Sequence, residues 1–380
     1  MPINATMHRR MPGHATTLLV LVTVAVACAG CGDGDGPKTL LRLHETVVAL
    51  ALRGSELAWL SGHGPSGCHL SLSLESSGKM QRVRLPPAVS HPGVFDCLEF
   101  AEYDSAKLVV SGGDIGWSVE DEGGNAGAIA QGASSVHPSR ATVLGRELTD
   151  GPGNYPNSGH ILGGVAATDD AVYWGRASLD ARGACEFSYA DPGCQTRVAS
   201  GAVYTWSRGR SRRVPDLPVP AALAAAGDLV AIAPRIPGWS GGRPPIGPIE
   251  VRGPGGLMRI RVKPGNNVLD IRLSHHLLAV LDDRDELFVY DLPSGRFLRR
   301  LSSEGRFEVT DTKLVLWNGR RLLVVDPRTG RRRTVVAFVR PASETAFHWT
   351  VTAVAVDGDR VAWAQTTNLG VSIVRAVRVK

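Results

Sequence analysis

The stretch VLDIRLSHHLLAVLDDRDELFVYDLPSGRFLRRLS, residues 268–302, decides the fold of this chain. It holds four apolar segments, each about as long as one strand, and short polar or glycine-containing turns separate them. This pattern predicts four antiparallel strands joined by hairpins. A unit of this size cannot bury both of its faces alone, so we expect related units elsewhere in the chain.

The inner part of this unit recurs along the sequence. In each copy a small or polar residue opens a turn, two residues follow, and apolar positions come next, while another apolar-rich segment precedes the turn. Two short strands joined by a tight turn and repeated in this way are typical of the blades of a β-propeller. The copies are GSELAW (54–59), SAKLVV (105–110), DDAVYW (169–174), GDLVAI (227–232), HHLLAV (275–280), DTKLVL (311–316) and GDRVAW (358–363).

We therefore predict an all-β fold, a single β-propeller over residues 39–380 with seven four-stranded blades. Six or eight blades also fit, because the second blade is weakly patterned, and tandem β-sandwich domains are the alternative architecture. The seventh blade, which ends at Lys380, is one strand short. The segment Thr39–Thr46 has a strand-like composition, so we predict that it pairs with Val371–Val379 and closes the ring, leaving no unpaired edge.

Two third-strand phrases match one another closely, FVYDLPSGR (288–296) and LVVDPRTGR (323–331). They resemble the repeats of quinoprotein-like and YVTN-type (WD40-like) bacterial propellers. The resemblance implies that the Asp of each phrase accepts hydrogen bonds from the turn backbone and that the Gly adopts a positive φ. It concerns the fold alone, because no aligned set of tryptophans is found for a quinone, and we expect no cofactor.

The N-terminus has the organisation of a secretion signal. Arg9 and Arg10 precede the apolar segment Thr16–Ala29, which is too short for an ordinary membrane span and suits a signal-peptide core. The segment ends in ACAGC (27–31), which resembles the lipobox of bacterial lipoproteins, where the cysteine is diacylated. We predict a signal peptide over 1–30, a flexible tether over 31–38, and a lipid anchor at the outer face of the bacterial cell membrane. A plain signal peptide of a soluble secreted protein is the alternative.

The cysteine count favours Cys31 over Cys28 as the lipidated residue. If Cys31 is lipidated, four cysteines remain in the mature chain, whereas lipidation of Cys28 strands an odd thiol in an oxidising compartment. A turn at 191–193 can bring Cys185 and Cys194 together. We therefore predict the disulfides Cys185–Cys194 and Cys68–Cys97. A zinc site is the alternative, but no CxxC or HxxxH spacing accompanies these cysteines.

Two glycine-rich motifs mimic catalytic signatures. GHGPSG (62–67) satisfies GxGxxG, but a strand follows it, whereas a dinucleotide site needs a helix N-terminus. GWSGG (238–242) satisfies GxSxG, but the surrounding prolines exclude the helix of a nucleophile elbow. We interpret both as blade loops and Ser240 as a loop serine, and we assign no catalytic residue.

The acidic run DDRDE (282–286) lies between two predicted strands, so we interpret it as a solvated hairpin tip rather than a cation site. The adjacent His275 and His276 point apart in a strand or turn and cannot readily chelate one metal. We therefore predict no metal site.

Aromatic residues divide into core and loop positions. Trp59, Trp174 and Trp363 end their strands at one shared repeat position, which predicts packing between blades, whereas Trp317 comes one position later in its copy. Tyr155 and Trp239 lie in long predicted loops and are our candidates for ligand contact.

The overall charge excludes few functions. The formal charge is +6, but the basic residues are spread along the chain, with small clusters at 208–213 and 331–333. A nucleic-acid-binding protein more often concentrates its basic residues on one face, so we expect no nucleic-acid partner.

Two functions remain. The first is a monomeric, membrane-anchored binding or scaffold module, whose protein or small-molecule partner meets one face of the ring near loops 145–163 and 234–248. The second is an extracytoplasmic enzyme, a hydrolase or lyase, with its site at the mouth of the central channel. The predicted inner strands carry mostly Ala, Val and Leu, with Asp270 and Glu99 among the exceptions, which favours binding.

Overall fold

A computed structural model describes residues 36–64, 68–86, 96–102, 106–121, 128–136, 140–148, 158–183, 194–238, 240–241, 246–262, 268–282, 284–303, 305–338 and 347–379. The predicted signal peptide and most of the predicted tether lie outside these residues. Cys28, Cys31, Tyr155, Cys185 and Trp239 lie outside them as well.

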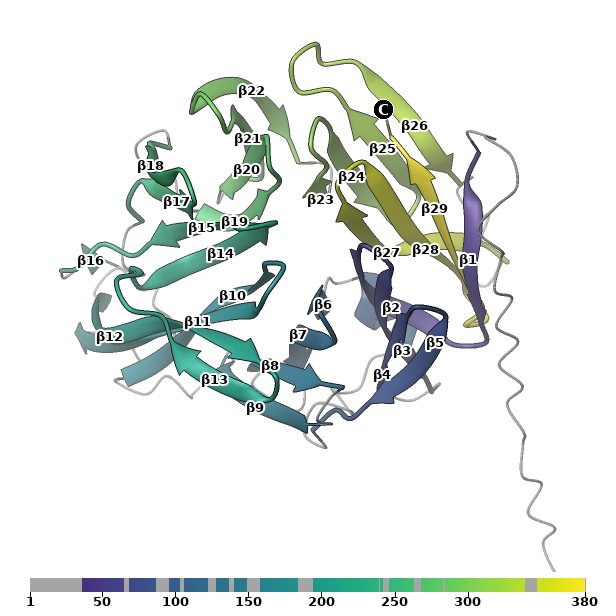
Figure 1. Ribbon diagram of the computed structural model, residues 1–380, viewed down its shortest axis with the longest axis horizontal. Coiled ribbons are helices and arrows are strands. Elements are labelled where there is room, and N and C mark those ends of the chain that lie inside the picture. The colour runs from purple at the N-terminus through teal and green to yellow at the C-terminus, as the bar shows by residue number, and fades with distance from the viewer. Residues whose placement is uncertain are drawn as a thin grey trace, which may run out of the picture.

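Seven antiparallel sheets form a ring around a central channel, which confirms the predicted seven-bladed propeller (Figure 1). The innermost strands contact one another in chain order around the channel, and the last returns to the first. From the channel outward, blade 1 comprises β2 (Thr46–Arg53), β3 (Glu56–His63), β4 (His69–Ser76) and β5 (Lys79–Val83); blade 2, β6 (Ala106–Ser111), β7 (Asp114–Asp121), β8 (Ala128–Ser135) and β9 (Arg140–Leu148); blade 3, β10 (Ser158–Ala167), β11 (Val172–Gly183), β12 (Cys194–Ser207) and β13 (Arg210–Arg213).

The remaining blades follow the same order. Blade 4 comprises β14 (Pro220–Ala226), β15 (Leu229–Pro234), β17 (Ile249–Gly253) and β18 (Gly256–Ile260); blade 5, β19 (Val268–Leu273), β20 (Leu277–Asp282), β21 (Glu286–Asp291) and β22 (Arg296–Ser302); blade 6, β23 (Arg306–Val309), β24 (Leu314–Asn318), β25 (Arg321–Val325) and β26 (Arg332–Ala337); blade 7, β27 (Trp349–Asp357), β28 (Arg360–Thr367), β29 (Ser372–Arg378) and β1 (Lys38–Leu43). A short strand, β16 (Ser240–Gly241), adds to blade 3 by pairing with β12.

The N-terminal strand β1 closes the ring as predicted. It pairs antiparallel with β29, from Lys38 opposite Ala376 to Leu43 opposite Ser372. The Ser372 hydroxyl secures the junction, because it donates to the Glu45 carbonyl at 2.7 Å and accepts from the Val47 amide at 3.0 Å. Both ends of the chain therefore build one blade.

Blade 2 departs from the prediction. The apolar segment CLEFAE precedes the phrase SAKLVV, so the repeat pattern predicts a strand there, but it forms the helix α1 (Cys97–Glu102). The phrase SAKLVV supplies β6, the innermost strand of blade 2, and not the second strand. Asp96 begins the helix, because its Oδ1 accepts from the amides of Leu98 at 2.8 Å and Glu99 at 2.9 Å. We predicted Glu99 in an inner strand, but the structure places it in the helix, where it is exposed.

The boundary between blades 2 and 3 also differs from the prediction. The loop expected over 145–163 is shorter, because β9 continues to Leu148 and β10 begins at Ser158, ahead of the predicted start of blade 3.

The core lies between neighbouring blades, where the apolar faces of the sheets pack. Trp59, Trp174 and Trp363, all on second strands, are 4% exposed or less, as their shared repeat position predicts. Trp117 on β7 has the corresponding place in blade 2 and is fully buried, and its indole N–H donates to the Ser134 hydroxyl at 3.1 Å. Blade 2 is thus a regular member of the ring despite its weak pattern.

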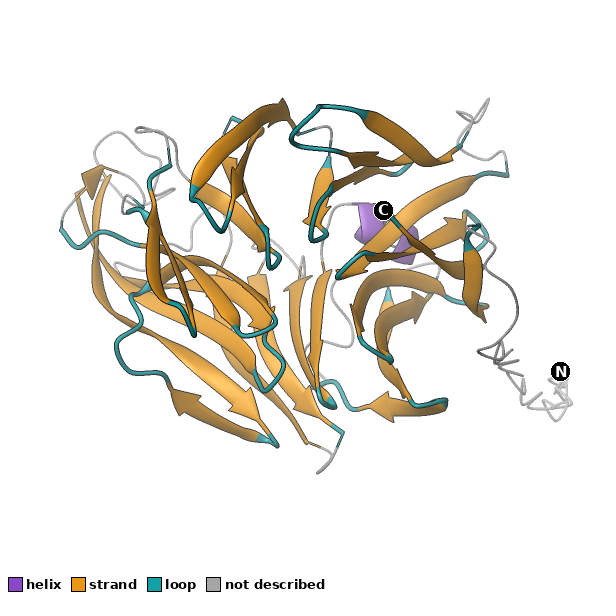
Figure 2. Cartoon of the chain, turned by 45° about the horizontal axis from the view of Figure 1, so that its top comes forward, coloured by secondary structure: helices purple, strands orange, loops and turns teal. Residues whose placement is uncertain are grey.

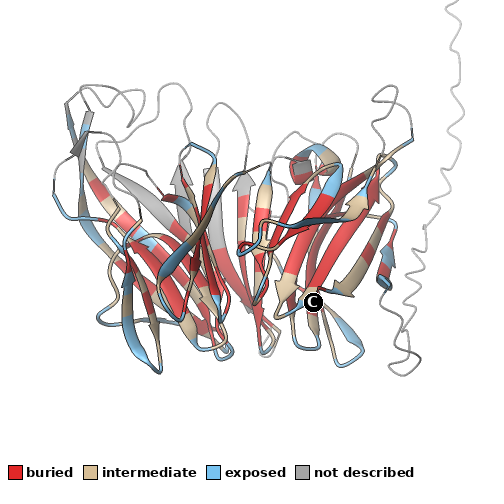
Figure 3. Ribbon diagram, turned by 90° about the horizontal axis from the view of Figure 1, so that it is seen from above, coloured by how far each residue is buried: buried red, intermediate tan, exposed pale blue. Residues whose placement is uncertain are grey.

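The two faces of the ring carry different connections (Figure 3). Because successive strands reverse direction, the first-to-second turns of all blades and the third-to-fourth turns of blades 1–6 lie on one face, which we name the turn face. Short segments such as 54–55, 112–113, 227–228 and 358–359 make these first-to-second turns. The second-to-third and blade-to-blade connections lie on the opposite face, which we name the loop face. The strand ends joined by the long connections 84–105, 149–157, 184–193, 235–248 and 338–348 lie on this face.

Candidate functional site

The central channel contains a cavity of about 300 Å³, lined by the innermost strands of all seven blades. Most of the lining is Ala, Val and Leu, as the sequence of these strands predicts. Charged residues also line it, and four of them form one paired group: Lys107 on β6, Asp270 and Arg272 on β19, and Glu308 on β23. We name these four residues the channel cluster.

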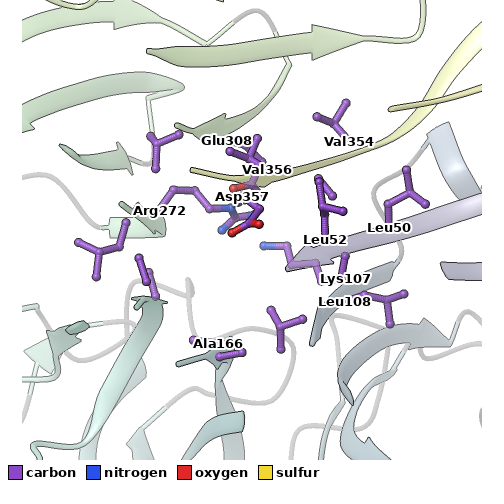
Figure 4. A pocket seen from close by; sticks show the side chains of 18 of the residues that line it. Leu50, Leu52, Lys107, Leu108, Ala166, Arg272, Glu308, Val354, Val356 and Asp357 are labelled. Carbon is purple, nitrogen blue, oxygen red and sulfur yellow. Dashed lines mark hydrogen bonds and ion pairs between the residues drawn. The ribbon is translucent and has the colours of Figure 1, made fainter. Parts of the chain in front are cut away.

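The channel cluster crosses the ring. Figure 4 shows Lys107 and Arg272 reaching into the cavity from opposite sides. Lys107 Nζ lies 2.9 Å from Asp270 Oδ2, and Arg272 Nη1 lies 2.5 Å from Asp270 Oδ1. Arg272 Nε also donates to Glu308 Oε1 at 2.7 Å. Two cations and two carboxylates therefore link blades 2, 5 and 6 across the channel.

The two carboxylates differ in their electrostatics. Burial alone would raise the pKa of Asp270, but the charges of Arg272 and Lys107 outweigh burial and hold that pKa below its usual range. Burial raises the pKa of Glu308, and the charge and hydrogen bond of Arg272 do not offset the effect. Asp270 is thus the charged centre of the cluster, whereas ionisation of Glu308 is disfavoured.

Helix α1 lies at the loop-face end of the channel (Figure 2). It contacts β2 and β27, the innermost strands of blades 1 and 7. Arg306, the first residue of β23, donates to the Thr352 carbonyl at 3.2 Å and to the Ala101 carbonyl in the helix. These contacts attach the helix to the inner strands of blades 6 and 7.

A disulfide between Cys68 and Cys97 fixes the start of α1 to blade 1, with 4.7 Å between the Cα atoms. Gly62 on β3 makes room for it: a Cβ at this position would lie 2.5 Å from Cys68 Sγ and 2.6 Å from Cys97 Sγ. The first glycine of the GxGxxG motif thus serves disulfide packing.

At the turn face, the first-to-second turns contact one another around the channel. Turn carboxylates accept neighbouring backbone amides: Asp357 from Gly54 at 2.7 Å, Glu56 from Gly112 at 3.1 Å, and Asp311 from His275 at 3.3 Å. The Asp169 amide donates to the Gly227 carbonyl at 3.0 Å, and the Asp311 amide donates to Gly358 at 3.2 Å.

Two further contacts complete this ring of turns. The Ser111 hydroxyl donates to the Asp169 carbonyl at 3.0 Å. The His275 ring packs so closely against Gly227 that a Cβ on this glycine would collide with it. Arg53 crosses from blade 1 to blade 3, where it pairs with Asp169. His275 Nδ1 lies 3.2 Å from Asp311 Oδ1. The amide of the neighbouring His276 donates to the Ser274 hydroxyl.

The loop face carries an exposed apolar pair that sequence reasoning missed. Phe347 and Leu369 are 63% and 76% exposed. They flank His348 and Asn368, whose backbone and side-chain groups bond at 3.3 and 3.5 Å. The Phe347 ring meets Trp349 edge-on, with 6.1 Å between centroids. The sequence offered one signal for this pair, because Leu369 is a large apolar residue in a turn and Phe347 is one just before a strand.

Several predicted sites are placed differently or remain outside the described residues. Tyr155, Trp239, Cys185 and Cys31 lie outside them; Cys194 begins β12 opposite Gly183. Ser240 lies in β16, opposite Thr196 of β12, which is not the strand-to-helix turn of a nucleophile elbow.

We predicted that the acidic run 282–286 is a solvated hairpin tip, but its first residue is not exposed to solvent. Asp282 is fully buried. Its Oδ1 accepts from the amides of Arg284 at 3.0 Å and Glu286 at 2.8 Å. It therefore shapes the turn between β20 and β21.

The turn phrases of blades 5 and 6 behave as their resemblance to bacterial propeller repeats implies. Asp326 Oδ1 accepts from the amides of Arg328 at 2.8 Å and Thr329 at 3.1 Å. Gly295 and Gly330 have φ values of 64° and 76°. A hydrogen bond from Lys313 is the main cause that lowers the pKa of Asp326 to about 2.

Among the described residues, no group of three or more His, Cys, Asp or Glu side chains is arranged to hold a metal ion. The same part of the chain has no helix long and apolar enough to cross a membrane.

No protein-family model matches the chain, and no curated protein sequence is significantly similar to it. Solved structures with a similar arrangement include the computationally designed Ika8 protein, 13% identical with a TM-score of 0.40. Another is Sqt1 of Saccharomyces cerevisiae, 12% identical with a TM-score of 0.36. Each comparison covers 91% of this chain and 100% of the other.

Proposed function

We propose that this protein is a binding or scaffold propeller that receives a partner on its loop face. The supporting observation is the contrast between the two faces. The turn face is built from short turns that bond one another. The strand ends on the loop face are joined by long stretches of sequence, and the exposed pair Phe347 and Leu369 lies there. A rigid ring that presents elaborated loops on one side suits recognition.

The channel gives less support to the alternative of a propeller hydrolase or lyase. General acid–base catalysis needs a group free to exchange a proton with substrate. In the channel cluster, Asp270 is bonded to both Lys107 and Arg272, and Glu308 to Arg272. Such mutual pairing is what a structural crosslink requires.

We further propose that a lipid on Cys31 anchors the propeller to the outer face of the bacterial membrane. The first strand supports a specific orientation. Since β1 leads into β2 on the loop face, Lys38 lies at the turn-face end of the outer wall. Cys31 precedes Lys38 by a segment that extends at most about 25 Å. The turn face would therefore lie toward the membrane and the loop face away from it.

A photo-crosslinking residue in place of Leu369 tests the loop face in intact cells. We expect a discrete crosslinked partner from this position. The matched control places the same residue at Asp228, in the turn between β14 and β15 on the turn face. Equal crosslinking from both positions, or none from Leu369, would contradict the proposal.

Metabolic labelling with a fatty-acid analogue tests the anchor. The wild-type protein should carry the label, and Cys31→Ser should lose it, whereas Cys28→Ser should retain it. Label that disappears in Cys28→Ser and persists in Cys31→Ser would assign the lipid to the other cysteine.

A further inference from the structure

The outermost strands of the blades share an unusual composition. In six of the seven, β1, β5, β13, β18, β22 and β26, every charged residue is Lys or Arg. The seventh, β9, has Glu147 beside Arg140 and Arg146. Charged side chains on edge strands prevent pairing with other sheets, but either sign serves that purpose. An excess of positive charge along these strands indicates, in addition, an anionic partner.

One group of basic residues lies where blades 5, 6 and 7 meet the turn face. We name as the basic edge six exposed residues: Lys38, Arg296, Arg331, Arg332, Arg333 and Arg378. All of them lie at or near strand ends on this face.

Two sets of contacts make the basic edge continuous. Arg299 of β22 donates to the Pro327 carbonyl at 2.9 Å, which joins the outer parts of blades 5 and 6. Val335 and Val336 of β26 belong to one apolar cluster with Val377 of β29, which joins blades 6 and 7.

Two nearby carboxylates are engaged by cations outside the basic edge. Asp291 pairs with Arg328 at 2.5 Å, and Asp326 pairs with Lys313 at 2.9 Å.

The basic edge also includes the residue at which the N-terminal segment joins the ring, Lys38. We propose that this edge docks on anionic phospholipid headgroups and holds the propeller in one orientation on the membrane. The inference rests on the proposed anchor for its biological setting, because a lipid on Cys31 would bring the membrane within about 25 Å of Lys38. Basic residues near such a surface each add about fivefold to the affinity.

Vesicle sedimentation tests the surface without the lipid anchor. The chain that begins at Gly36 retains every strand of the ring and lacks Cys31. It should bind vesicles of phosphatidylglycerol and phosphatidylcholine, bind phosphatidylcholine alone far more weakly, and lose binding as salt rises.

Two triple variants locate the binding surface. Replacing Arg331, Arg332 and Arg333 with Gln should lower the vesicle partition coefficient about 100-fold. The control replaces Arg210, Arg212 and Arg213 with Gln; it removes the same charge from the exposed outermost strand of blade 3 and should retain most of the binding. If the first variant melts early, the double variant Arg296→Gln with Arg378→Gln replaces it, with an expected loss of about 20-fold.

Equal losses in the two triple variants would overturn the location, because they would reflect net charge alone. Failure to bind phosphatidylglycerol, or preferential binding to duplex DNA, would overturn the membrane assignment. Neither result would affect the fatty-acid label on Cys31, so the docking surface and the anchor fail separately.

Discussion

Gly62 shows how a single missing side chain shapes the molecule. A Cβ at this position would lie far inside normal contact distance of both sulfur atoms of the Cys68–Cys97 disulfide, 2.5 and 2.6 Å away. We predict that Gly62→Ala lowers the free energy of unfolding by about 1–3 kcal/mol, because the disulfide or β3 must shift. Urea unfolding measures the change. Gly255→Ala is the matched control, since nothing lies within 4 Å of a Cβ there, and equal losses would contradict the steric argument.

Asp270 is the carboxylate that balances both cations of the channel cluster. We predict that Asp270→Asn lowers the free energy of unfolding at pH 7 by about 3 kcal/mol, because Lys107 and Arg272 lose their shared counter-charge. The pKa of Asp270 is held below its usual range, so its stabilisation is present above about pH 4 and is lost as the pH falls through the folded-state value. The gap between variant and wild type should therefore narrow below about pH 4.

Glu308→Gln provides the comparison for this pH dependence. Burial raises the pKa of Glu308, so ionisation lowers stability as the pH rises above about 4.3. Glutamine removes that cost and can still accept from Arg272. A loss at pH 7 as large as that of Asp270→Asn would contradict the assignment of Asp270 as the charged centre.

At the scale of elements, the β11–β12 hairpin supports the proposed local disulfide. These strands pair up to Gly183 opposite Cys194, so the antiparallel register brings together the two ends of the connection 184–193. We predict that Cys185 is bonded to Cys194. Peptide mapping without reduction should recover the two cysteines in one linked pair, and a link from Cys185 to any other cysteine would exclude the local pairing.

The blades differ in how far sequence alone predicts them. Blades 5 and 6 are clear because alternating apolar residues, an Asp that bonds the turn and a Gly at positive φ all agree. CLEFAE misled because its apolar content also fits a strand, and the Asp96 cap, which decides for a helix, is a single residue. A short segment of this kind is settled by its contacts with the ring and the Cys68–Cys97 disulfide.

The channel cluster could be predicted only in part. Asp270 was recognisable as a charge in an apolar strand, and Arg272 lies two residues on, on the same side of β19. Lys107 was missed because its strand was assigned to the wrong position in blade 2. Its pairing with Asp270 also depends on how the ring sets blade 2 across from blade 5. Contacts between blades distant in sequence are a property of the closed ring, which local pattern does not encode.

At the scale of the whole molecule, the turn face has an inner ring of bonded turns and an outer group of basic residues. On the turn face, Asp169, Asp311 and Asp357 belong to the inner ring of turns, and Arg296, Arg332 and Lys38 lie at the periphery. The inner carboxylates bond neighbouring turns and stabilise the ring, whereas the outer cations remain exposed to solvent. One face thus combines an internal fastening with a surface for anionic partners.

Closure by β1 makes the stability of the ring depend on its two ends together. β1 buries Leu41 and Leu43, which are 3% and 8% exposed, and covers β29, which would otherwise be an open edge.

We predict that a chain beginning at Thr46 is less stable than one beginning at Lys38 by at least about 3 kcal/mol, from the burial of these leucines alone. Urea unfolding of the two chains measures the difference. The shorter chain also loses the Glu45 side chain, which accepts from the Ser61 hydroxyl at 2.5 Å. Substitution of Glu45 by Ala in the longer chain is the control for that contact, since it keeps β1 and the carbonyl that accepts from Ser372. Equal midpoints for the two chains would show that the other six blades hold the ring without its closing strand.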